Sequence, residues 1–321
     1  PPSAERLPQT PLVTDLAAMG RETGQPGGDI SLLMARSKDT RMMTVYGYAR
    51  LVGFTPQLTL EPDIALKVEN AGDQTFTFHL RPRHRWSDGE PFTTEDFRYY
   101  WEDMALNEFL SPFGPPEALL VNGKPPRVEV IDRHTIRYHW AAPNPLFLPS
   151  LAGARPLYIY APAHYLKQFH AGHADEENLN SMVEEAGVRN WAGLHTRYGH
   201  QYKFDNPDLP TLQPWLCVTP APSERFIFER NPYFHRVDAT GQQLPYLDRV
   251  IVNIASSGLI PAKTGAGESD LQGRYLRLDN YPFLMEGGER NNFVVRLWQM
   301  GIGSQMAVYP NLNANDDTWR K

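Results

Sequence analysis

An alternation of apolar and polar side chains marks a strand near the end of the first quarter of the chain. Phe76, Phe78 and Leu80 alternate with polar residues over positions 75–80, which is the two-residue period of a half-buried strand. Trp86 and the turn 87–91, Ser-Asp-Gly-Glu-Pro, come next. The glycine tolerates positive φ and the proline prevents a regular strand from continuing, so this pattern predicts a strand that ends in a turn.

A helix is predicted directly after this turn. Thr93 or Thr94 is a suitable N-cap, and Glu95 and Asp96 place negative charge on the first helical turn. Apolar side chains then recur at i, i+3, i+4 and i+7, the spacing of one helix face. These residues are Phe97, Tyr100, Trp101 and Met104.

Further hydrophobic patterns predict the other elements. Strands are expected at 29–35, 225–230 and 250–254, and a hairpin is expected over 128–140, where two alternating runs flank a polar turn. Short helical pieces are expected around Trp191 within the charged stretch 170–210. The first 28 residues, rich in Pro, Thr, Gly and charge, are expected to form an extended arm or a poorly ordered terminus.

Composition narrows the possible classes of protein. A chain of 321 residues with 41% hydrophobic residues is long enough for two lobes. The net charge of −6 and the absence of a long basic run argue against nucleic-acid binding. No apolar run approaches the roughly 20 residues of a membrane-spanning helix, and the start lacks the pattern of a signal peptide, so an exported protein would have lost its targeting segment. Cys217 is the only cysteine and is interpreted as a small core residue.

The block 72–101 closely resembles the signature of family 5 of the extracellular solute-binding proteins of ABC importers, the oligopeptide-, dipeptide- and nickel-binding type. The matching elements are Thr77-Phe78-His79-Leu80-Arg81, Trp86-Ser87-Asp88-Gly89, Pro91-Phe92-Thr93 and Glu95-Asp96-Phe97. Arg230-Asn231-Pro232-Tyr233-Phe234 and Gly267-Glu268-Ser269-Asp270-Leu271 match later motifs of the family in the same order. The resemblance covers about residues 28–321.

The resemblance implies a mixed α/β fold of the type II periplasmic-binding-protein kind. It implies a first lobe formed by 29–53 and 213–292, in which strands near 30 and 250 share one mixed sheet and a helix runs through 46–52. It also implies an inserted family-specific domain at 54–212 and an N-terminal arm at 1–28. A hinge crossing with a strand-like segment at 293–298 should open the 293–321 region, which would start a second lobe. Because family members are much longer, the chain is expected to be an N-terminal fragment that lacks most of that lobe.

The function implied by the resemblance is capture of a peptide or another small polar solute, such as an opine, an oligosaccharide or a chelate. The partner would be the membrane permease of an ABC importer, with no catalysis and no cofactor. Such a receptor would be periplasmic or lipid-anchored outside the cell, and monomeric at full length. The resemblance places solute contacts at Arg41, Met42 and Met43 and at Phe113.

Two alternatives from other classes remain open. His164, His170, His173, Asp175 and Glu176 are residue types that bind Zn²⁺ or Ni²⁺, but their spacing matches no metalloprotease pattern, and a solvated helix end is the preferred interpretation, with no metal. A carbohydrate- or peptide-processing hydrolase is the second alternative, although the chain has no Gly-x-Ser-x-Gly element.

Overall fold

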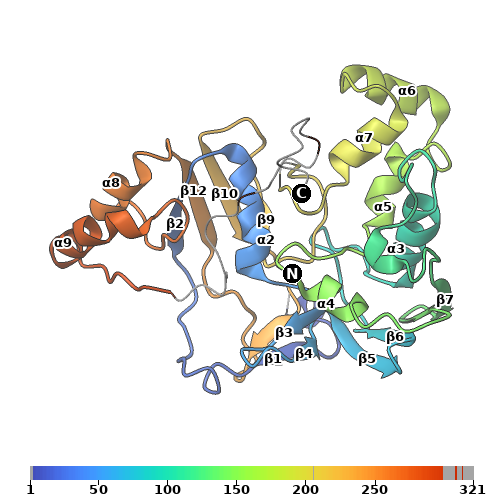
Figure 1. Ribbon diagram of the computed structural model, residues 1–321, viewed down its shortest axis with the longest axis horizontal. Coiled ribbons are helices and arrows are strands. Elements are labelled where there is room, and N and C mark those ends of the chain that lie inside the picture. The colour runs from blue at the N-terminus through green and yellow to red at the C-terminus, as the bar shows by residue number, and fades with distance from the viewer. Residues whose placement is uncertain (1–2, 205, 299–307, 309–312, 314–321) are drawn as a thin grey trace.

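The computed structural model describes residues 3–204, 206–298, 308 and 313 (Figure 1). It contains two four-stranded sheets, each with its own hydrophobic core, and helices that lie around them. Within these residues no helix has the length and apolar character to cross a membrane. The mixed α/β architecture predicted from the sequence is confirmed.

The first sheet joins strands that are far apart in the sequence. It has the order β2-β12-β10-β9, with β2 at Asp29–Met34, β12 at Arg249–Ile254, β10 at Arg225–Arg230 and β9 at Trp215–Cys217. β2 pairs in parallel with β12, and Val250 lies opposite Ile30. The prediction that strands near 30 and 250 share one sheet is therefore confirmed. Cys217 is buried in the core of this sheet, as expected.

The second sheet is antiparallel and has the order β5-β6-β8-β7. Its strands are β5 at Ala65–Ala71, β6 at Thr75–Leu80, β8 at Thr135–His139 and β7 at Arg127–Asp132. The alternation seen in the sequence orients β6, since Phe76 and Phe78 are buried while Thr75 is only partly buried. The hairpin predicted over 128–140 is formed by β7 and β8.

Small elements complete the described chain. The remaining strands are β1 (Leu12–Thr14), β3 (Val52–Phe54), β4 (Leu60–Pro62) and β11 (Arg236–Asp238). The α-helices are α1 (Ser3–Arg6), α2 (Met42–Gly47), α3 (Thr94–Arg98), α4 (Phe147–Ala152), α5 (Ala163–Leu166), α6 (Glu176–Glu185), α7 (Trp191–Tyr198), α8 (Ile260–Gly265) and α9 (Tyr281–Asn291). β1 pairs in parallel with β11 and β3 pairs with β4. The helices α6 and α7 confirm the helical pieces expected around Trp191.

Trp86 fills the joint between β6 and the following helix. Its side chain is fully buried and packs edge-on against Phe92, with ring centroids 5.5 Å apart. Thr93 caps α3, as predicted, through a reciprocal arrangement in which Asp96 accepts the backbone N–H of Thr93 at 2.9 Å. α3 continues as a π-helix over Tyr99–Ala105.

Three predictions about secondary structure need correction. The helix predicted through 46–52 ends at Gly47, because Tyr48 adopts a left-handed conformation (φ 43°) and the chain enters β3 at Val52. The arm before residue 29 is partly regular, since it supplies β1 to a two-stranded sheet. Residues 293–298 form no strand, because they pair with no strand in the described part of the chain. Most of the rest of the expected crossing, 299–321, falls on residues that are not described.

The boundaries of the predicted domains stay a prediction. The core of the first sheet draws only on residues within 29–53 and 213–292. Ala49, Leu51, Val52 and Phe234, however, pack into the core of the second sheet although they lie in the ranges assigned to the first lobe. The core of the second sheet therefore includes residues from the ranges assigned to both predicted domains.

Candidate functional site

The segment after β2 lies at one edge of the first sheet. Because β2 and β12 run in parallel, their carboxyl ends meet there, and in open α/β sheets ligands bind outside the carboxyl ends of the strands. A 3₁₀ helix at Ser37–Arg41 and then α2 follow β2. The Oγ of Ser37 donates to the carbonyl of Ser223 at 3.4 Å. This segment is therefore held against the loop that enters β10.

Asp39 is the buried acid of this segment. It is 1% exposed, and it accepts hydrogen bonds from Nη2 of Arg274 at 3.2 Å and from the hydroxyl of Tyr275. The backbone N–H of Arg36 donates at 3.1 Å to Oδ2 of Asp39, the oxygen that also accepts from Tyr275. Burial and the neighbouring Asp39 carboxylate raise the pKa of Tyr275, which therefore remains a donor at neutral pH. The carboxylate of Asp39 is thus satisfied by groups of the protein itself.

The three predicted contact residues at 41–43 differ in how deeply they are buried. Arg41 and Met42 are partly buried, and the Sδ of Met42 lies 3.8 Å from Nη1 of Arg274. Met43 is 1% exposed and belongs to the core of the first sheet. The expected solute contact by Met43 is therefore not supported, since core packing leaves its side chain no exposed surface.

Phe113 lies in the loop between the π-helix and a 3₁₀ turn at Glu117–Leu119, and its side chain is fully exposed. Its packing into a core is thereby excluded. Gly114 has a φ of +80° directly after it, and the Oγ of Ser111 donates to the carbonyl of Met104 at 2.9 Å. No hydrogen bond, ion pair or ring contact within the described residues links Phe113 to the segment 41–43. A role for Phe113 and Arg41 in binding stays a prediction.

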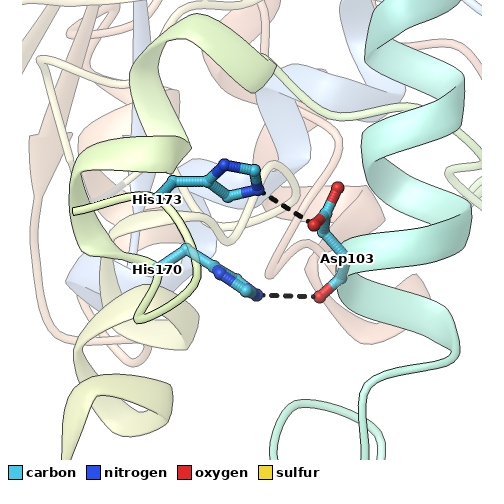
Figure 2. A group of neighbouring side chains, drawn as sticks. All are labelled: Asp103, His170 and His173. Atoms are coloured by element: carbon cyan, nitrogen blue, oxygen red, sulfur yellow. Dashed lines mark hydrogen bonds and ion pairs between the residues drawn. The ribbon is translucent and has the colours of Figure 1, made fainter.

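The histidines considered as metal ligands lie at two different places in the structure. His164 pairs with Asp88 at 2.7 Å, and Asp175 caps α6. His170 and His173 instead face Asp103, which is presented by the π-helix (Figure 2). These three offer ligand atoms within 4.8 Å of one another.

Hydrogen bonds within this group account for its geometry. The Nδ1 of His170 accepts the backbone N–H of Gly172 at 3.0 Å, so the proton of its neutral ring is on Nε2. That nitrogen lies 3.1 Å from the backbone carbonyl of Asp103 and donates to it. His173 Nε2 lies 2.9 Å from Oδ1 of Asp103. Coordination of a metal by Nε2 of His170 would require the other tautomer and the loss of the Gly172 bond.

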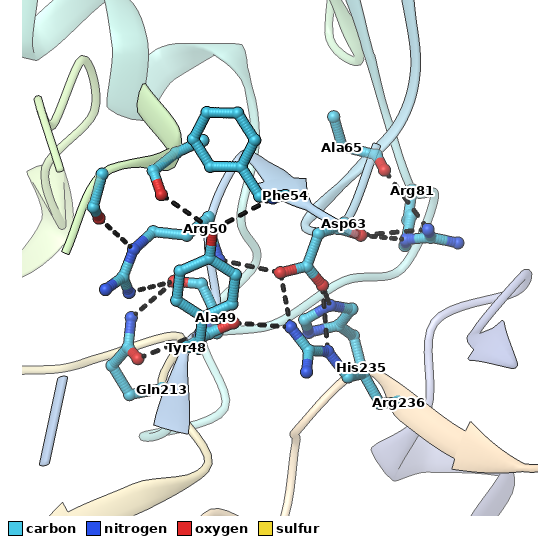
Figure 3. A network of polar contacts seen from close by, with 12 residues as sticks. Tyr48, Ala49, Arg50, Phe54, Asp63, Ala65, Arg81, Gln213, His235 and Arg236 are labelled. Atoms are coloured by element: carbon cyan, nitrogen blue, oxygen red, sulfur yellow. Dashed lines mark hydrogen bonds and ion pairs between the residues drawn. The ribbon is translucent and has the colours of Figure 1, made fainter. Parts of the chain in front are cut away.

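A buried polar network is centred on Asp63, in the link between β4 and β5 (Figure 3). Its carboxylate accepts from Nε2 of His235 at 2.7 Å, from Nη2 of Arg236 at 2.6 Å and from the backbone N–H of Arg50 at 2.8 Å. Its carbonyl accepts from Nε of Arg81 at 3.1 Å. Burial raises the pKa of Asp63, but Arg236 and His235 outweigh it and hold the pKa well below its usual range.

Sequence reasoning missed the partners of this site. The buried acid of the segment, Asp39, was not among the expected contact residues. Arg274 and Tyr275 lie 235 and 236 positions later in the chain. The partners of Asp63, His235 and Arg236, also come from distant positions in the chain. A pattern in neighbouring residues cannot predict contacts between side chains that lie so far apart in the sequence.

Comparisons with known proteins agree on one family. The family model described as bacterial extracellular solute-binding proteins, family 5, middle, matches residues 59–286. A periplasmic alpha-galactoside-binding protein of Rhizobium meliloti is 24% identical over 303 residues, which is 84% of this chain and 39% of that protein. The periplasmic oligopeptide-binding protein OppA of Salmonella typhimurium is 28% identical over 199 residues, which is 58% of this chain and 31% of that protein.

Solved structures give the same result. A structure of an oligopeptide-binding protein OppA aligns with a TM-score of 0.81 and 30% identity, and covers 91% of this chain and 46% of its own. The periplasmic binding protein MelB of Agrobacterium fabrum C58, in complex with stachyose, has the same fold, with a TM-score of 0.70, 24% identity, and coverage of 90% and 43%. This chain spans less than half the length of these relatives. By its match over 59–286, the chain belongs to family 5 of the bacterial extracellular solute-binding proteins.

Proposed function

We propose that this chain is part of a receptor that captures a small polar solute outside the cytoplasm and delivers it to an ABC importer, without catalysis. The observation that carries the proposal is the family match over 59–286. Relatives named as periplasmic binding proteins for oligopeptides and for alpha-galactosides support the extracytoplasmic location and the class of solute. The comparisons give no support to the hydrolase alternative.

We infer that the solute lies outside the carboxyl edge of the first sheet, with the segment 36–44 along one wall. Arg41 and Met42 are partly buried there and keep some accessible surface. A binding protein needs only differential affinity between an open and a closed form, so side chains that position a solute suffice and no reactive group is required.

The state of Asp39 favours an oligosaccharide over a peptide with a free amino terminus. A cationic amine would be met best by a carboxylate whose charge is not already engaged. Asp39 is 1% exposed and is bound by Arg274 and Tyr275, while Arg36, Lys38 and Arg41 add positive charge to the same segment. A neutral, hydroxyl-rich solute avoids that electrostatic cost.

A thermal-shift screen tests the proposal directly. A form of the protein that carries both lobes is titrated with raffinose and stachyose and with tri- to pentapeptides, because a ligand that binds only the folded state raises the melting temperature. We expect a rise with the galactosides and no hydrolysis products by chromatography. A rise in melting temperature only with peptides would show that the solute is a peptide and not an oligosaccharide, while the receptor function would stand. Turnover of a solute would contradict the receptor function itself.

A further inference from the structure

The outer edge of β2 is covered by a segment that forms no regular strand. β2 lies at the end of the first sheet, which has the order β2-β12-β10-β9. Oδ2 of Asp270 accepts the backbone N–H of Ser31 at 2.6 Å, and the N–H of Asp270 donates to the carbonyl of Ser31 at 3.0 Å. The family motif at 267–271 therefore supplies a residue that satisfies both backbone groups of Ser31.

Gln272 repeats this arrangement farther along β2. Its Oε1 accepts the N–H of Leu33 at 2.9 Å, and its Nε2 donates to the carbonyl of Leu33 at 2.9 Å. Ser31 and Leu33 are two positions apart, the spacing at which a strand presents its backbone groups to the same edge. Side chains thus replace the backbone of a further strand, and they fasten residues 270–275, the edge segment, to β2.

The far end of the edge segment reaches the candidate site. Nε2 of Gln272 also donates to the carbonyl of Arg274 at 2.7 Å, which ties the fastened part of the segment to its end. Arg274 and Tyr275 then bind the buried carboxylate of Asp39. The guanidinium group of Arg274 lies 5.2 Å from the ring centroid of Tyr275, so the two side chains support each other.

The backbone of Tyr275 is strained. Its φ is 65°, in the left-handed region that favours glycine. A residue with a Cβ persists there only where the surrounding structure holds it, and such residues are concentrated at binding sites and switches. The hydrogen bond from the hydroxyl of Tyr275 to the carboxylate of Asp39 offsets part of this cost, because bonds to a charged acceptor are strong.

Asp39 in turn determines the shape of the segment 36–44. Its Oδ2 accepts the N–H of Arg36 at 3.1 Å, and its own N–H donates to the carbonyl of Arg36 at 2.9 Å. These two bonds close the first turn of the 3₁₀ helix. Arg41 and Met42, which keep some accessible surface, follow directly. A displacement of Asp39 would therefore displace the residues that we infer to lie along the solute.

We propose that Tyr275 is a positioning residue of this receptor, which holds the segment 36–44 in the arrangement that accepts the solute. It acts through Asp39. The role in binding rests on the proposed function, whereas the effect on the segment does not. If a segment adopts its binding arrangement for only a tenth of the time, the apparent affinity falls about tenfold.

Hydrogen exchange measured by mass spectrometry tests the effect on the segment, in the whole chain and without a ligand. Tyr275→Phe keeps the ring beside Arg274 and removes only the hydroxyl. Exchange in peptides that cover 36–44 should become about tenfold faster, because a buried carboxylate loses a donor. Peptides that cover β6 should exchange as in the wild type.

Tyr275→Gly separates positioning from general stability. Glycine accepts the left-handed conformation without strain, so this variant should melt no lower than Tyr275→Phe. Exchange in 36–44 should nevertheless be at least as fast. Tyr246→Phe is the matched control, since the hydroxyl of Tyr246 donates at 2.6 Å to Asp238, another buried acid, in β11. This control should leave exchange in 36–44 unchanged.

Calorimetric titration of a form that carries both lobes tests the role in binding. The probe is stachyose or, if the thermal-shift screen selects a peptide, that peptide. Tyr275→Phe should bind about tenfold more weakly than the wild type, and Tyr246→Phe should bind equally well. If the wild type binds neither class of solute, the proposed function fails, and the exchange experiment alone decides the role of Tyr275.

Three results would each overturn the inference. Exchange in 36–44 could be as slow in Tyr275→Phe as in the wild type, or it could be equally fast in the control Tyr246→Phe. The third result is a wild type and a Tyr275→Phe variant that bind the same solute with equal affinity.

Discussion

At the scale of the residue, Asp63 holds together segments that are distant in the sequence. Its side chain is 7% exposed, and its partners are His235, Arg236 at the start of β11, and the backbone of Arg50 in the segment after α2. A buried acid of this kind is stable only while its partners remain, because an unpaired buried charge loses its hydration without compensation. The network therefore fixes the link between β4 and β5 relative to β11 and the segment after α2.

Asp63→Asn should lower the free energy of unfolding by about 3 kcal/mol, because it leaves Arg236 without its charged partner. The check is urea unfolding at pH 7, with Asp208→Asn as the control. Asp208 is exposed, and a substitution there should change stability by less than about 0.5 kcal/mol. A loss at Asp63 no larger than that of the control would contradict the role assigned to the network.

The pH dependence of the same variant follows from the lowered pKa of Asp63. A carboxyl group whose pKa is lower in the folded state contributes stability above its unfolded pKa of about 3.9 and loses it as the pH falls below that value. The difference between wild type and Asp63→Asn should therefore stay constant from pH 7 to 5 and shrink below about pH 4. A difference that already shrinks near pH 6 would mean that the carboxyl group is protonated there.

The role of a single residue could be predicted from the sequence only where its partner lies within a few positions of it. Thr93 could be identified as a cap because its partner Asp96 is three positions away. Met43 could not be identified as a core residue, since nothing near it in the sequence shows that β10 and β12 cover it. The pairing of Asp39 with Arg274 also depends on how the chain folds back.

At the scale of the element, the helix from Thr94 to Ala105 is covered on two sides. Phe97 and Trp101 pack into the core of the second sheet, as the predicted face requires. Tyr99 is also fully buried, within the cluster formed with α5, α6 and α7. The i, i+3, i+4 spacing did not predict this second contact, because it describes one face of a regular α-helix and the segment from Tyr99 is a π-helix.

His195 links α7 to this π-helix, and its pKa leads to a prediction. Its Nε2 lies 2.8 Å from the hydroxyl of Tyr99, and the ring is 1% exposed. Burial and the neighbouring His170 lower the pKa of His195 to about 4. The folded protein keeps this ring neutral, while the unfolded chain binds a proton below a pH of about 6.5.

A histidine with a lowered pKa makes the fold less stable as the pH falls. Wild type should lose about 2 kcal/mol more than His195→Gln between pH 7 and 5, since one extra proton bound on unfolding costs about 1.4 kcal/mol per pH unit below the unfolded pKa. Glutamine keeps an acceptor for Tyr99. Urea unfolding at both pH values measures the slope, and His139→Gln, at an exposed histidine of β8, serves as the control. Parallel slopes for wild type and His195→Gln would show that His195 is protonated in the fold.

A substitution at Trp86 tests how much the packing between β6 and α3 contributes to stability. Trp86→Ala should destabilise the protein by about 3–5 kcal/mol, because it removes a large buried ring and leaves a cavity. Trp298→Ala is the control, since that ring is 81% exposed and its removal should cost little. In a form of the protein that carries both lobes, the folded fraction of Trp86→Ala should bind solute with unchanged affinity. Normal stability combined with a large loss of affinity would instead place Trp86 in the binding site.

At the scale of the whole molecule, the prediction that connected the most distant segments was that strands near 30 and 250 lie in one sheet. It was possible because both strands lie beside motifs of one family, so the resemblance supplied the topology that local patterns lack. The strand-like crossing at 293–298 was also implied by the resemblance, but these residues pair with no strand in the described part of the chain. How the first sheet meets a solute depends on a second wall, which the described residues do not contain.

The last prediction concerns that second wall. A receptor of this class gains affinity by enclosing its solute between two lobes, which removes water and brings contacts from both sides. This chain, which spans less than half the length of its relatives, should therefore fold but bind solute far more weakly than a form that carries both lobes. Folding is expected because each sheet has its own core within the chain. Calorimetric titration of the two forms with one identified solute makes the comparison, after circular dichroism has shown that both are folded. Equal dissociation constants would mean that the edge of the first sheet and its segment 36–44 already form the complete site.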